Sequence, residues 1–494
     1  MEIHFWGATR TVTGSLHEVQ QGGRRVLLDC GLFQGRRAEA RDRNCCFGFD
    51  PGEVDRVLLS HAHIDHSGNL PNLVKQGFRG PVHATEATQD LCRAMLMDSA
   101  YLQERDAEFL MRRRERRRHV LDDYDEPVVE PLYTQDDARR ALELFAPLPM
   151  HGRVDLERGL TVETVEAGHM LGSVSMVLDD GRVRLGFSGD IGRAKLPIIR
   201  DPQPMPACDY LIMESTYGDR LHQDEGAVLD KLADIVNRTA ARGGKIVAPA
   251  FAVGRTQQLV LLLHELIHEG RIPNIPVFVD SPLAVNVTET FRKYSNLFDE
   301  ETAKMLRDDA DRDVFGFSRL RYIRDVNDSK ALNGLRGPML IISASGMCEA
   351  GRVIHHLRNT VSDPRNTILI TGFQAENTLG RKILDKWPEV PIFGEMYRLR
   401  AEVAKINELS GHADQRELLG WLKPIAAGLK KIFLVHGEAR QQEALKKAIE
   451  GTYGVEVMIP GRGEGVRLEY RWQAGKRIGD QGISINFGEC FSFS

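Results

Sequence analysis

One short loop of this chain concentrates side chains that bind metal ions. Within six consecutive residues the sequence places three imidazoles and one carboxylate, those of His61, His63, Asp65 and His66. Imidazole and carboxylate ligands together are typical of sites for zinc and similar first-row metals. A single zinc ion rarely takes four ligands from one tight loop, so the pairing of His-x-His with Asp-His favours two adjacent ions. The pattern predicts metal-assisted hydrolysis.

Other polar side chains follow strands that the sequence predicts elsewhere. We expect strands at 24–28, 56–59, 161–166 and 183–187, and the residues just beyond their ends include Asp29, His61, His169 and Asp190. Loops held at the end of a rigid sheet are where sites are usually built. A carboxylate has two oxygens, so Asp190 can bridge two ions, while His169 can complete the first. Water between two such ions loses a proton near neutral pH and becomes a hydroxide nucleophile.

Length, charge and cysteine content exclude several classes of protein. A chain of 494 residues is too long for one compact core, which predicts two or three structural units. The net charge of -5 argues against a general nucleic-acid-binding surface but leaves room for a local basic cleft. The seven scattered cysteines without a Cys-x-x-Cys pair indicate reduced thiols in a cytoplasmic protein. No secretory signal is visible, and the apolar run 259–263 is far shorter than a membrane span, so we expect no membrane association.

The organisation of the chain changes near residue 210. Before it, hairpins dominate, such as the strands 15–20 and 24–28 on either side of a Gly-Gly turn. After it, strands alternate with helices: we expect strands at 245–248, 339–342 and 367–370, and helices at 227–242, 256–269 and 351–360. This alternation predicts a mostly parallel sheet covered by helices.

A predicted helix, 97–118, ends in a cluster of arginines: Arg112, Arg113, Arg114, Arg116, Arg117 and Arg118. The cluster could attract phosphates near a site. The favoured interpretation is a solvated helix face whose arginines pair with the acidic residues at 122–126.

The loop 61–66, with the later histidine and the two aspartates, resembles the metallo-β-lactamase superfamily. The resemblance implies an α/β fold, an αββα sandwich with a dinuclear site at one edge of its paired sheets. The ligands that it implies are His61, His63 and His169 for one zinc, Asp65 and His66 for the other, and Asp190 as the bridge. Asp29 matches an aspartate that orients the loop from behind it.

Five downstream segments resemble the β-CASP branch, the nucleic-acid-processing members of this superfamily. They are 213–218, 248–257, 343–347, 409–414 and 434–438. The resemblance implies that His412 is the general acid, that Glu214 keeps it protonated and oriented, and that Asp65 belongs to the catalytic set. In RNA-cleaving members a histidine at the place of His436 completes the second zinc site, whereas DNA-processing relatives carry valine there. The histidine in this chain therefore favours RNA.

Three residues are weaker candidates for contacts with the substrate. Arg255 follows a glycine and precedes a predicted helix, an arrangement that suits a phosphate. Ser345 ends a predicted strand, and Ser410 lies beside the expected acid. An ordinary loop role explains each of these residues nearly as well.

The resemblance also implies a domain order. Residues 1–208 would form the first part of the metallo-β-lactamase core and residues 398–470 its second part. Residues 209–397 would form an inserted β-CASP domain with a parallel sheet, which caps the metal edge, and 471–494 a C-terminal tail. Single-stranded RNA would run through the cleft between core and cap. Whether the protein forms a homodimer stays open.

These features predict a ribonuclease with two Zn²⁺ ions per chain, with Mn²⁺ as an alternative. A hydroxide that bridges the metals would attack phosphorus inside an RNA chain. Protonation of the leaving 3′ oxygen by His412 would give 5′-phosphate and 3′-hydroxyl ends.

Three alternatives stay open. A 5′→3′ exonuclease of the ribonuclease J type usually carries His-x-Ser-Gly-His near the acid, where this chain has Glu408. A small-molecule hydrolase, a thioesterase or β-lactamase, needs neither Glu214 nor His412. A non-catalytic RNA-processing scaffold of the same branch loses metal ligands, all of which this chain keeps.

Overall fold

The computed structural model describes residues 1–35, 37–118, 130–222, 228–309, 312–372, 374, 377–406 and 409–469, without the side chains of 37, 38 and 113–118. The predicted tail 471–494, Glu408 and the acidic stretch 122–126 lie outside the described residues. So do the side chains of most of the arginine cluster.

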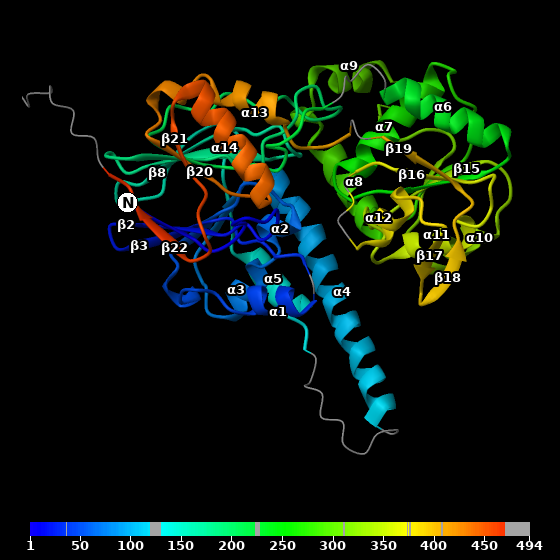
Figure 1. Ribbon diagram of the computed structural model, residues 1–494, viewed down its shortest axis with the longest axis horizontal. Helices are drawn as coiled ribbons and strands as arrows, with labels where there is room; N and C mark the ends of the chain where they lie inside the picture. Colours follow the sequence, from blue (N-terminus) through cyan, green and yellow to red (C-terminus); the bar gives the residue numbers. More distant parts are fainter. Residues whose placement is uncertain are drawn as a thin grey trace, which may run out of the picture.

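Two seven-stranded mixed sheets pack face to face and form the larger part of the molecule (Figure 1). The first sheet has the order β22 (Glu464–Arg467), β1 (Glu2–Phe5), β2 (His17–Gln21), β3 (Arg24–Leu28), β4 (Arg56–Leu58), β5 (Val82–Ala84), β6 (Phe145–Pro147). The second has the order β21 (Glu456–Met458), β20 (Lys431–Leu434), β11 (Tyr210–Met213), β10 (Arg184–Phe187), β9 (Val174–Asp179), β8 (Thr161–Glu166), β7 (Gly152–Asp155). Their inner faces share one buried core, with Phe5 and Leu28 from one sheet and Phe187 and Phe433 from the other.

Helices cover the outer face of each sheet. The first carries α1 (Arg37–Cys45), α2 (Ile64–Ser67), α3 (Leu70–Lys75), α4 (Glu86–Arg118) and α5 (Gln135–Glu143), and the second carries α13 (Gln415–Leu422) and α14 (Ala439–Tyr453) (Figure 1). Leu418 of α13 and Leu445 of α14, for example, are buried against Leu211 and Leu434 of the second sheet. The predicted αββα sandwich is confirmed.

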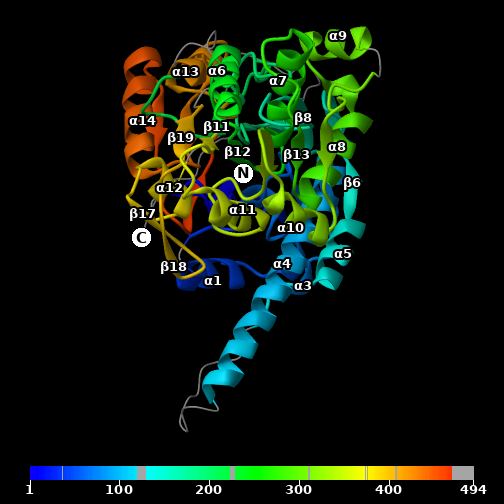
Figure 2. The same ribbon diagram turned by 90° about the vertical axis from the view of Figure 1, so that its right-hand side faces the viewer.

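A separate six-stranded sheet, whose neighbouring strands pair in parallel, forms the second unit. Its order is β14 (Leu320–Tyr322), β13 (Val277–Val279), β15 (Met339–Ser343), β12 (Lys245–Pro249), β16 (Thr367–Ile370), β19 (Glu402–Lys405). The helices around it are α6 (Val228–Ala241), α7 (Arg255–His268), α8 (Pro282–Lys293), α9 (Glu300–Asp308), α10 (Val326–Gly334), α11 (Arg352–Thr360) and α12 (Leu379–Leu384), as Figures 1 and 2 show. A hairpin of β17 (Glu389–Ile392) and β18 (Glu395–Arg398) lies at its lower end in Figure 1. The predicted parallel sheet is confirmed.

Strand pairing bears on where the two units divide. β11 pairs in parallel with β10 and β20, so it belongs to the sandwich. β19 pairs with β16, so it belongs to the parallel sheet. The boundaries at 209 and 397 stay a prediction, and this pairing favours moving them to just after β11 and just after β19.

The long helix α4 joins the two units and then extends beyond them (Figure 2). It has 33 residues and begins at Glu86, so the predicted start at 97 was wrong. The earlier turns were missed although Ala87, Leu91 and Met95 are buried at positions i, i+4 and i+8, on one face of the helix. Lys293 of α8 binds Asp90 of α4 at 2.6 Å between Nζ and Oδ2.

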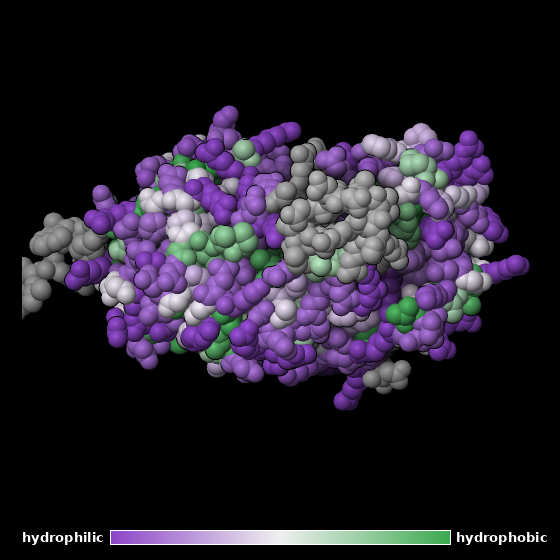
Figure 3. Space-filling model, turned by 90° about the horizontal axis from the view of Figure 1, so that it is seen from below, coloured by the Kyte–Doolittle hydropathy of each residue, from purple (hydrophilic) through white to green (hydrophobic). Residues whose placement is uncertain are grey.

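The outer surface is mostly polar. Figure 3 shows a largely hydrophilic face with small, separate apolar patches. Arg112, in the projecting half of α4, pairs with Glu108 at 3.8 Å. Among the described residues, no helix combines the length and the apolar character that crossing a membrane requires.

Three loops meet at the sandwich edge, and one of their contacts leaves no room for a side chain. The segment 191–193, just after β10, forms backbone hydrogen bonds with the segment 411–413. A Cβ atom added at Gly192 would stand 1.7 Å from the carbonyl oxygen of Gly168, in the loop after β8. Only glycine therefore lets the loops that carry the predicted ligands after β8 and β10 meet.

We expect Gly192→Ala to destabilise the metal-free protein by about 1–3 kcal/mol, because backbone atoms must shift to admit the methyl group. Urea unfolding measures this as a lower midpoint. The matched control is Gly420→Ala in α13, where an added Cβ meets nothing within 4 Å. Alanine is the better helix former, so this variant should gain up to about 1 kcal/mol. Equal midpoints for the two variants would contradict the account.

Candidate metal centre

The seven predicted metal ligands meet at one edge of the sandwich. β10, β11 and β20 run in parallel, and two antiparallel pairings give β8 the same direction. The carboxyl ends of these strands therefore share an edge, where sites in such sheets are built. Two groups form there: one of His61, His63, His169 and Asp190, and one of Asp65, His66 and His436.

The first group has dimensions close to those of a four-ligand metal site. Nδ1 of His63 lies 3.1 Å from Nε2 of His61 and 3.1 Å from Nε2 of His169. Oδ2 of Asp190 lies 3.5 Å from both of these Nε2 atoms. A tetrahedron with zinc–ligand bonds of about 2.0–2.2 Å places its ligand atoms roughly 3.3–3.6 Å apart. The four atoms therefore fit around one ion.

The second group shares Asp190 with the first. Nε2 of His66 lies 3.1 Å from Nε2 of His436 and 3.3 Å from Oδ1 of Asp190. Oδ2 of Asp65 lies 3.4 Å from Nε2 of His436. Oδ1 of Asp190 is buried and, among the described residues, accepts no hydrogen bond of good geometry. A buried carboxylate oxygen needs a positive partner, and a second cation between these atoms supplies one.

Asp29 contacts the second group from behind, at the place where the resemblance implied an orienting aspartate. Its Oδ2 lies 2.7 Å from Nδ1 of His66, so the ring turns Nε2 toward the other ligands. Its Oδ1 accepts the backbone N–H of Ser60 at 2.8 Å. Asp29 and His436 both have positive φ angles, of 60° and 50°. Left-handed backbone at non-glycine residues is typical of functional sites, where the surroundings hold it in place.

Two residues that support the histidines were not found from the sequence. Oγ of Ser60 lies 3.0 Å from Nδ1 of His61, and Oγ1 of Thr216 lies 3.0 Å from Nδ1 of His436. Each contact leaves the other ring nitrogen free to bind a metal. Ser60 directly precedes the histidine loop, a usable signal, whereas Thr216 meets a histidine 220 positions away.

Burial keeps the histidines of the first group neutral. It lowers the pKa of His63 to about 4, although Asp65 acts in the opposite direction. It also lowers the pKa of His61 well below the ordinary value, and the nearby His66 adds to this effect. Neutral imidazole is the form that binds metal ions.

His412 and Glu214 form a pair beside the first group. Nδ1 of His412 lies 3.3 Å from Oε1 of Glu214, which is fully buried and also accepts the N–H of Ile191 at 2.6 Å. The His412 ring lies 4.6 Å from the His169 ring, centroid to centroid. Burial alone would lower the pKa of His412, but the Glu214 carboxylate outweighs it and raises that pKa to about 9. His412 is therefore protonated at neutral pH, as a general acid must be.

The three weaker candidates for substrate contacts lie in two different parts of the molecule. Ser410 is buried next to Gly411, whose carbonyl oxygen lies 3.1 Å from Nδ1 of His169. Arg255 begins α7 and Ser345 follows β15, both in the parallel-sheet unit. The structure thus places Ser410 beside the candidate metal ligands, whereas Arg255 and Ser345 belong to the parallel-sheet unit.

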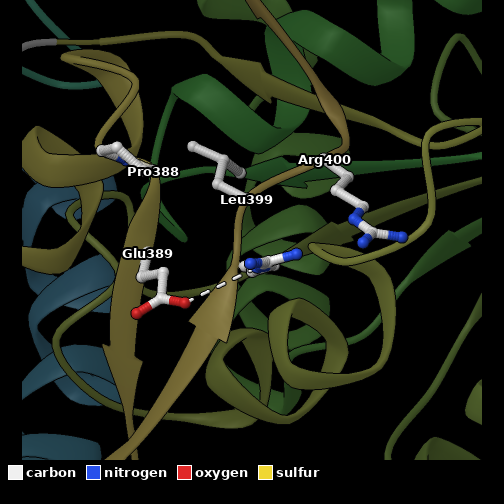
Figure 4. Close-up of a pocket in the computed structure, with 5 residues that line it drawn as sticks. Pro388, Glu389, Leu399 and Arg400 are labelled. Carbon is white, nitrogen blue, oxygen red and sulfur yellow. Dashed lines mark ion pairs between the residues drawn. The ribbon is translucent and has the colours of Figure 1, made fainter.

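A separate pocket of about 580 Å³ lies away from this centre. It opens beside the β17–β18 hairpin and is lined by Pro388, Glu389, Arg398, Leu399 and Arg400 (Figure 4). Its charged groups are an ion pair of Glu389 with Arg398 at 3.7 Å and the Arg400 guanidinium, which points away from that pair. The titratable groups that could do chemistry together converge at the sandwich edge.

Comparisons with known proteins agree with the geometry. Three family models match consecutive parts of the chain: the metallo-beta-lactamase superfamily at 17–243, the Beta-Casp domain at 256–383, and the Zn-dependent metallo-hydrolase RNA specificity domain at 396–460. Ribonuclease TTHA0252 of Thermus thermophilus is 38% identical over 467 residues, which cover 94% of this chain and 100% of that protein. The chain belongs to the metallo-β-lactamase superfamily. Its Beta-Casp and RNA specificity domains place it in the β-CASP branch.

More distant relatives share most of the chain. The transcription termination factor FttA of Methanothermobacter thermautotrophicus is 30% identical over 94% of this chain and 71% of its own length. A crystal structure of a protein of unknown function from Enterococcus faecalis V583 superposes with a TM-score of 0.53 at 14% identity, over 94% of this chain and 99% of that one. That likeness shows a shared fold.

We expect His436→Val to reduce the zinc content from about two ions per chain to about one, because the second group loses a ligand while the first stays whole. Elemental analysis after gel filtration measures the content. His151→Ala, which alters an exposed histidine, is the control and should keep the wild-type value. Unchanged zinc in His436→Val would contradict the assignment of His436.

Proposed function

We propose that this chain is a zinc-dependent ribonuclease that hydrolyses phosphodiesters within single-stranded RNA. It leaves 5′-phosphate and 3′-hydroxyl ends. The observation that carries the proposal is the contact of His412 with buried Glu214 beside two groups of metal-binding side chains. A small-molecule hydrolase of the superfamily needs the ligands alone, whereas this pair serves the release of an alcohol such as a ribose oxygen.

The choice of RNA rests on the relatives and on one domain. The relative that matches over its full length is named a ribonuclease. The RNA specificity domain at 396–460 contains both His412 and His436. This chain keeps every ligand that the resemblance implies, which argues against a non-catalytic scaffold.

The residues divide the reaction between them. Two zinc ions, for which Mn²⁺ is an alternative, would activate water and neutralise charge on the phosphate. Asp190 and Asp65 hold the ligand groups together, and Asp190 reaches both through its two oxygens. His412 faces Glu214 with Nδ1, so Nε2 is the atom that gives its proton to the leaving 3′ oxygen. Glu214 keeps that proton on the imidazole and fixes the ring.

A 5′→3′ exonuclease is the second candidate. An RNase J-like protein of Methanocaldococcus jannaschii is 28% identical over 93% of this chain and 98% of its own length. The two modes differ in their products: an exonuclease acting from a labelled 5′ end releases labelled mononucleotides, whereas an endonuclease releases oligonucleotides.

The scattered cysteines suit a reducing compartment, which we propose to be the cytoplasm. Cys30, Cys92, Cys208 and Cys348 are free and buried. Burial in apolar surroundings keeps thiols inert.

We expect His412→Ala and Glu214→Gln to lower kcat for RNA cleavage by about 10²–10⁴-fold with zinc content unchanged, because each removes proton transfer to the leaving oxygen. The measurement uses zinc-loaded protein with 5′-labelled and internally labelled single-stranded RNA, and maps the product ends. His268→Ala, at the exposed end of α7, should cleave like the wild type. Normal cleavage by His412→Ala, or products with a 2′,3′-cyclic phosphate, would contradict the proposal.

A further inference from the structure

We propose that the parallel-sheet unit carries a nucleotide subsite, in which the Phe251 ring stacks on a base and the Arg255 guanidinium binds the phosphate of the same nucleotide. The nucleotide is the one that carries the leaving 3′ oxygen, so the phosphate is its 5′ phosphate, one position upstream of the scissile one. This inference rests on the proposed ribonuclease function and adds residues that position the RNA.

Arg255 has the unsatisfied charge that an anion site needs. Its Nε and Nη1 atoms are buried and have no hydrogen-bond partner among the described residues. A buried guanidinium with two unpartnered nitrogens costs free energy, because these groups have lost water without gaining an acceptor. Burial also lowers the pKa of Arg255 to about 10, with Tyr217 acting in the opposite direction. A phosphate, which guanidinium binds through two parallel hydrogen bonds, removes this cost.

The start of α7 adds to the same site. The helix has 14 residues, and its N-cap is Gly254, which provides no side-chain oxygen for the first backbone N–H groups. A Cβ added at Gly254 would meet nothing within 4 Å, so the space in front of the helix is open. The N–H groups of Arg255 and Thr256 bond the carbonyl oxygens of Val253 and Phe251, so the helix dipole is what this end contributes toward an anion. The positive end of the helix and the charge of Arg255 thus favour an anion together.

Phe251 provides an aromatic surface close by in the sequence. It follows β12, and 44% of its surface is exposed, which is unusual for so large an apolar side chain. One edge of its ring lies against two glycines: an added Cβ would stand 3.0 Å from the ring at Gly346 and 3.8 Å at Gly372. The exposed part of the ring leaves an aromatic surface for a partner. Bases stack on exposed aromatic rings with little sequence preference.

The subsite lies where the parallel sheet is expected to bind a ligand. Phe251, Gly346 and Gly372 follow the carboxyl ends of β12, β15 and β16, which are neighbours in the sheet. Ligands of open parallel sheets bind outside these ends. Ser345, one of the weaker sequence candidates, directly precedes Gly346 and so belongs to the same edge.

The charge interaction of Arg255 with Tyr217 and the ring contact of Tyr217 with His412 favour the leaving-group side for the subsite. Tyr217 lies close enough to Arg255 to affect its pKa. The Tyr217 ring lies 5.8 Å from the His412 ring, centroid to centroid and edge to face. His412 protonates the leaving 3′ oxygen, so the nucleotide next to His412 is the one upstream of the scissile phosphate. We assign the 5′ phosphate of that nucleotide to Arg255.

The test removes the negative charge of a single phosphate from the RNA. A single-stranded RNA with a mapped cleavage site receives a neutral methylphosphonate at the phosphate one position upstream. We expect the wild-type zinc-loaded protein to lose about 10- to 100-fold in kcat/KM on this substrate, the loss of one hydrogen-bonded charge contact. Arg255→Gln should lose a similar factor on unmodified RNA and should not be slowed further by the methylphosphonate, since the two changes remove one contact. Arg307→Gln, which alters an exposed arginine of α9, should behave like the wild type on both RNAs.

The base contact has a parallel test. An abasic residue at the upstream nucleotide should slow the wild type, and Phe251→Leu should be insensitive to it. Wild-type cleavage that is indifferent to the methylphosphonate, or equal slowing of wild type and Arg255→Gln, would overturn the subsite alone. A wild-type protein that cleaves no RNA would overturn the ribonuclease proposal, and the subsite with it. The substrate-side change keeps the test valid even where a variant folds poorly.

Discussion

The carboxylate of Asp190, buried between two groups of imidazoles, is the interaction on which the rest of the site depends. Its Oδ2 faces His61 and His169, and its Oδ1 faces His66. Ring nitrogens of neighbouring histidines stand 3.1 Å apart, and burial lowers the pKa of His61, His63 and His169, which disfavours charge on them. Bound cations would turn the same close packing into coordination, and the fold holds the ligands in the positions that this requires.

The direction of the strands brings most of the ligand residues together. Parallel strands end at the same edge, so the residues after β8, β10 and β20 meet although the chain separates them by long distances. Gly192 permits the closest approach of two of these loops. Asp29, Ser60 and Thr216 then fix the tautomers of the rings. The parallel-sheet unit stands opposite, where its own strand ends present Phe251 and Arg255.

The sequence pointed to six of the seven candidate metal ligands, because four share one loop and because His169 and Asp190 follow strands that hydrophobic patterns reveal. His436 was assigned only through resemblance. Glu214 and His412 were found only through resemblance, since nothing local to either residue shows that they meet across 198 positions. Thr216 and Phe251 were not found at all. Their roles depend on a contact with a distant histidine and on exposure, which only the tertiary structure determines. The start of α4 was placed too late, and the sheet membership of β11 and β19 was not visible, because strand pairing is a long-range choice.

Crystallography at the zinc absorption edge tests the central claim most directly. The account predicts two anomalous peaks about 3.5–4 Å apart, one among His61, His63 and His169 and one between His66 and His436, with Asp190 touching both. A single peak in zinc-saturated crystals, or two peaks that do not share Asp190, would contradict it.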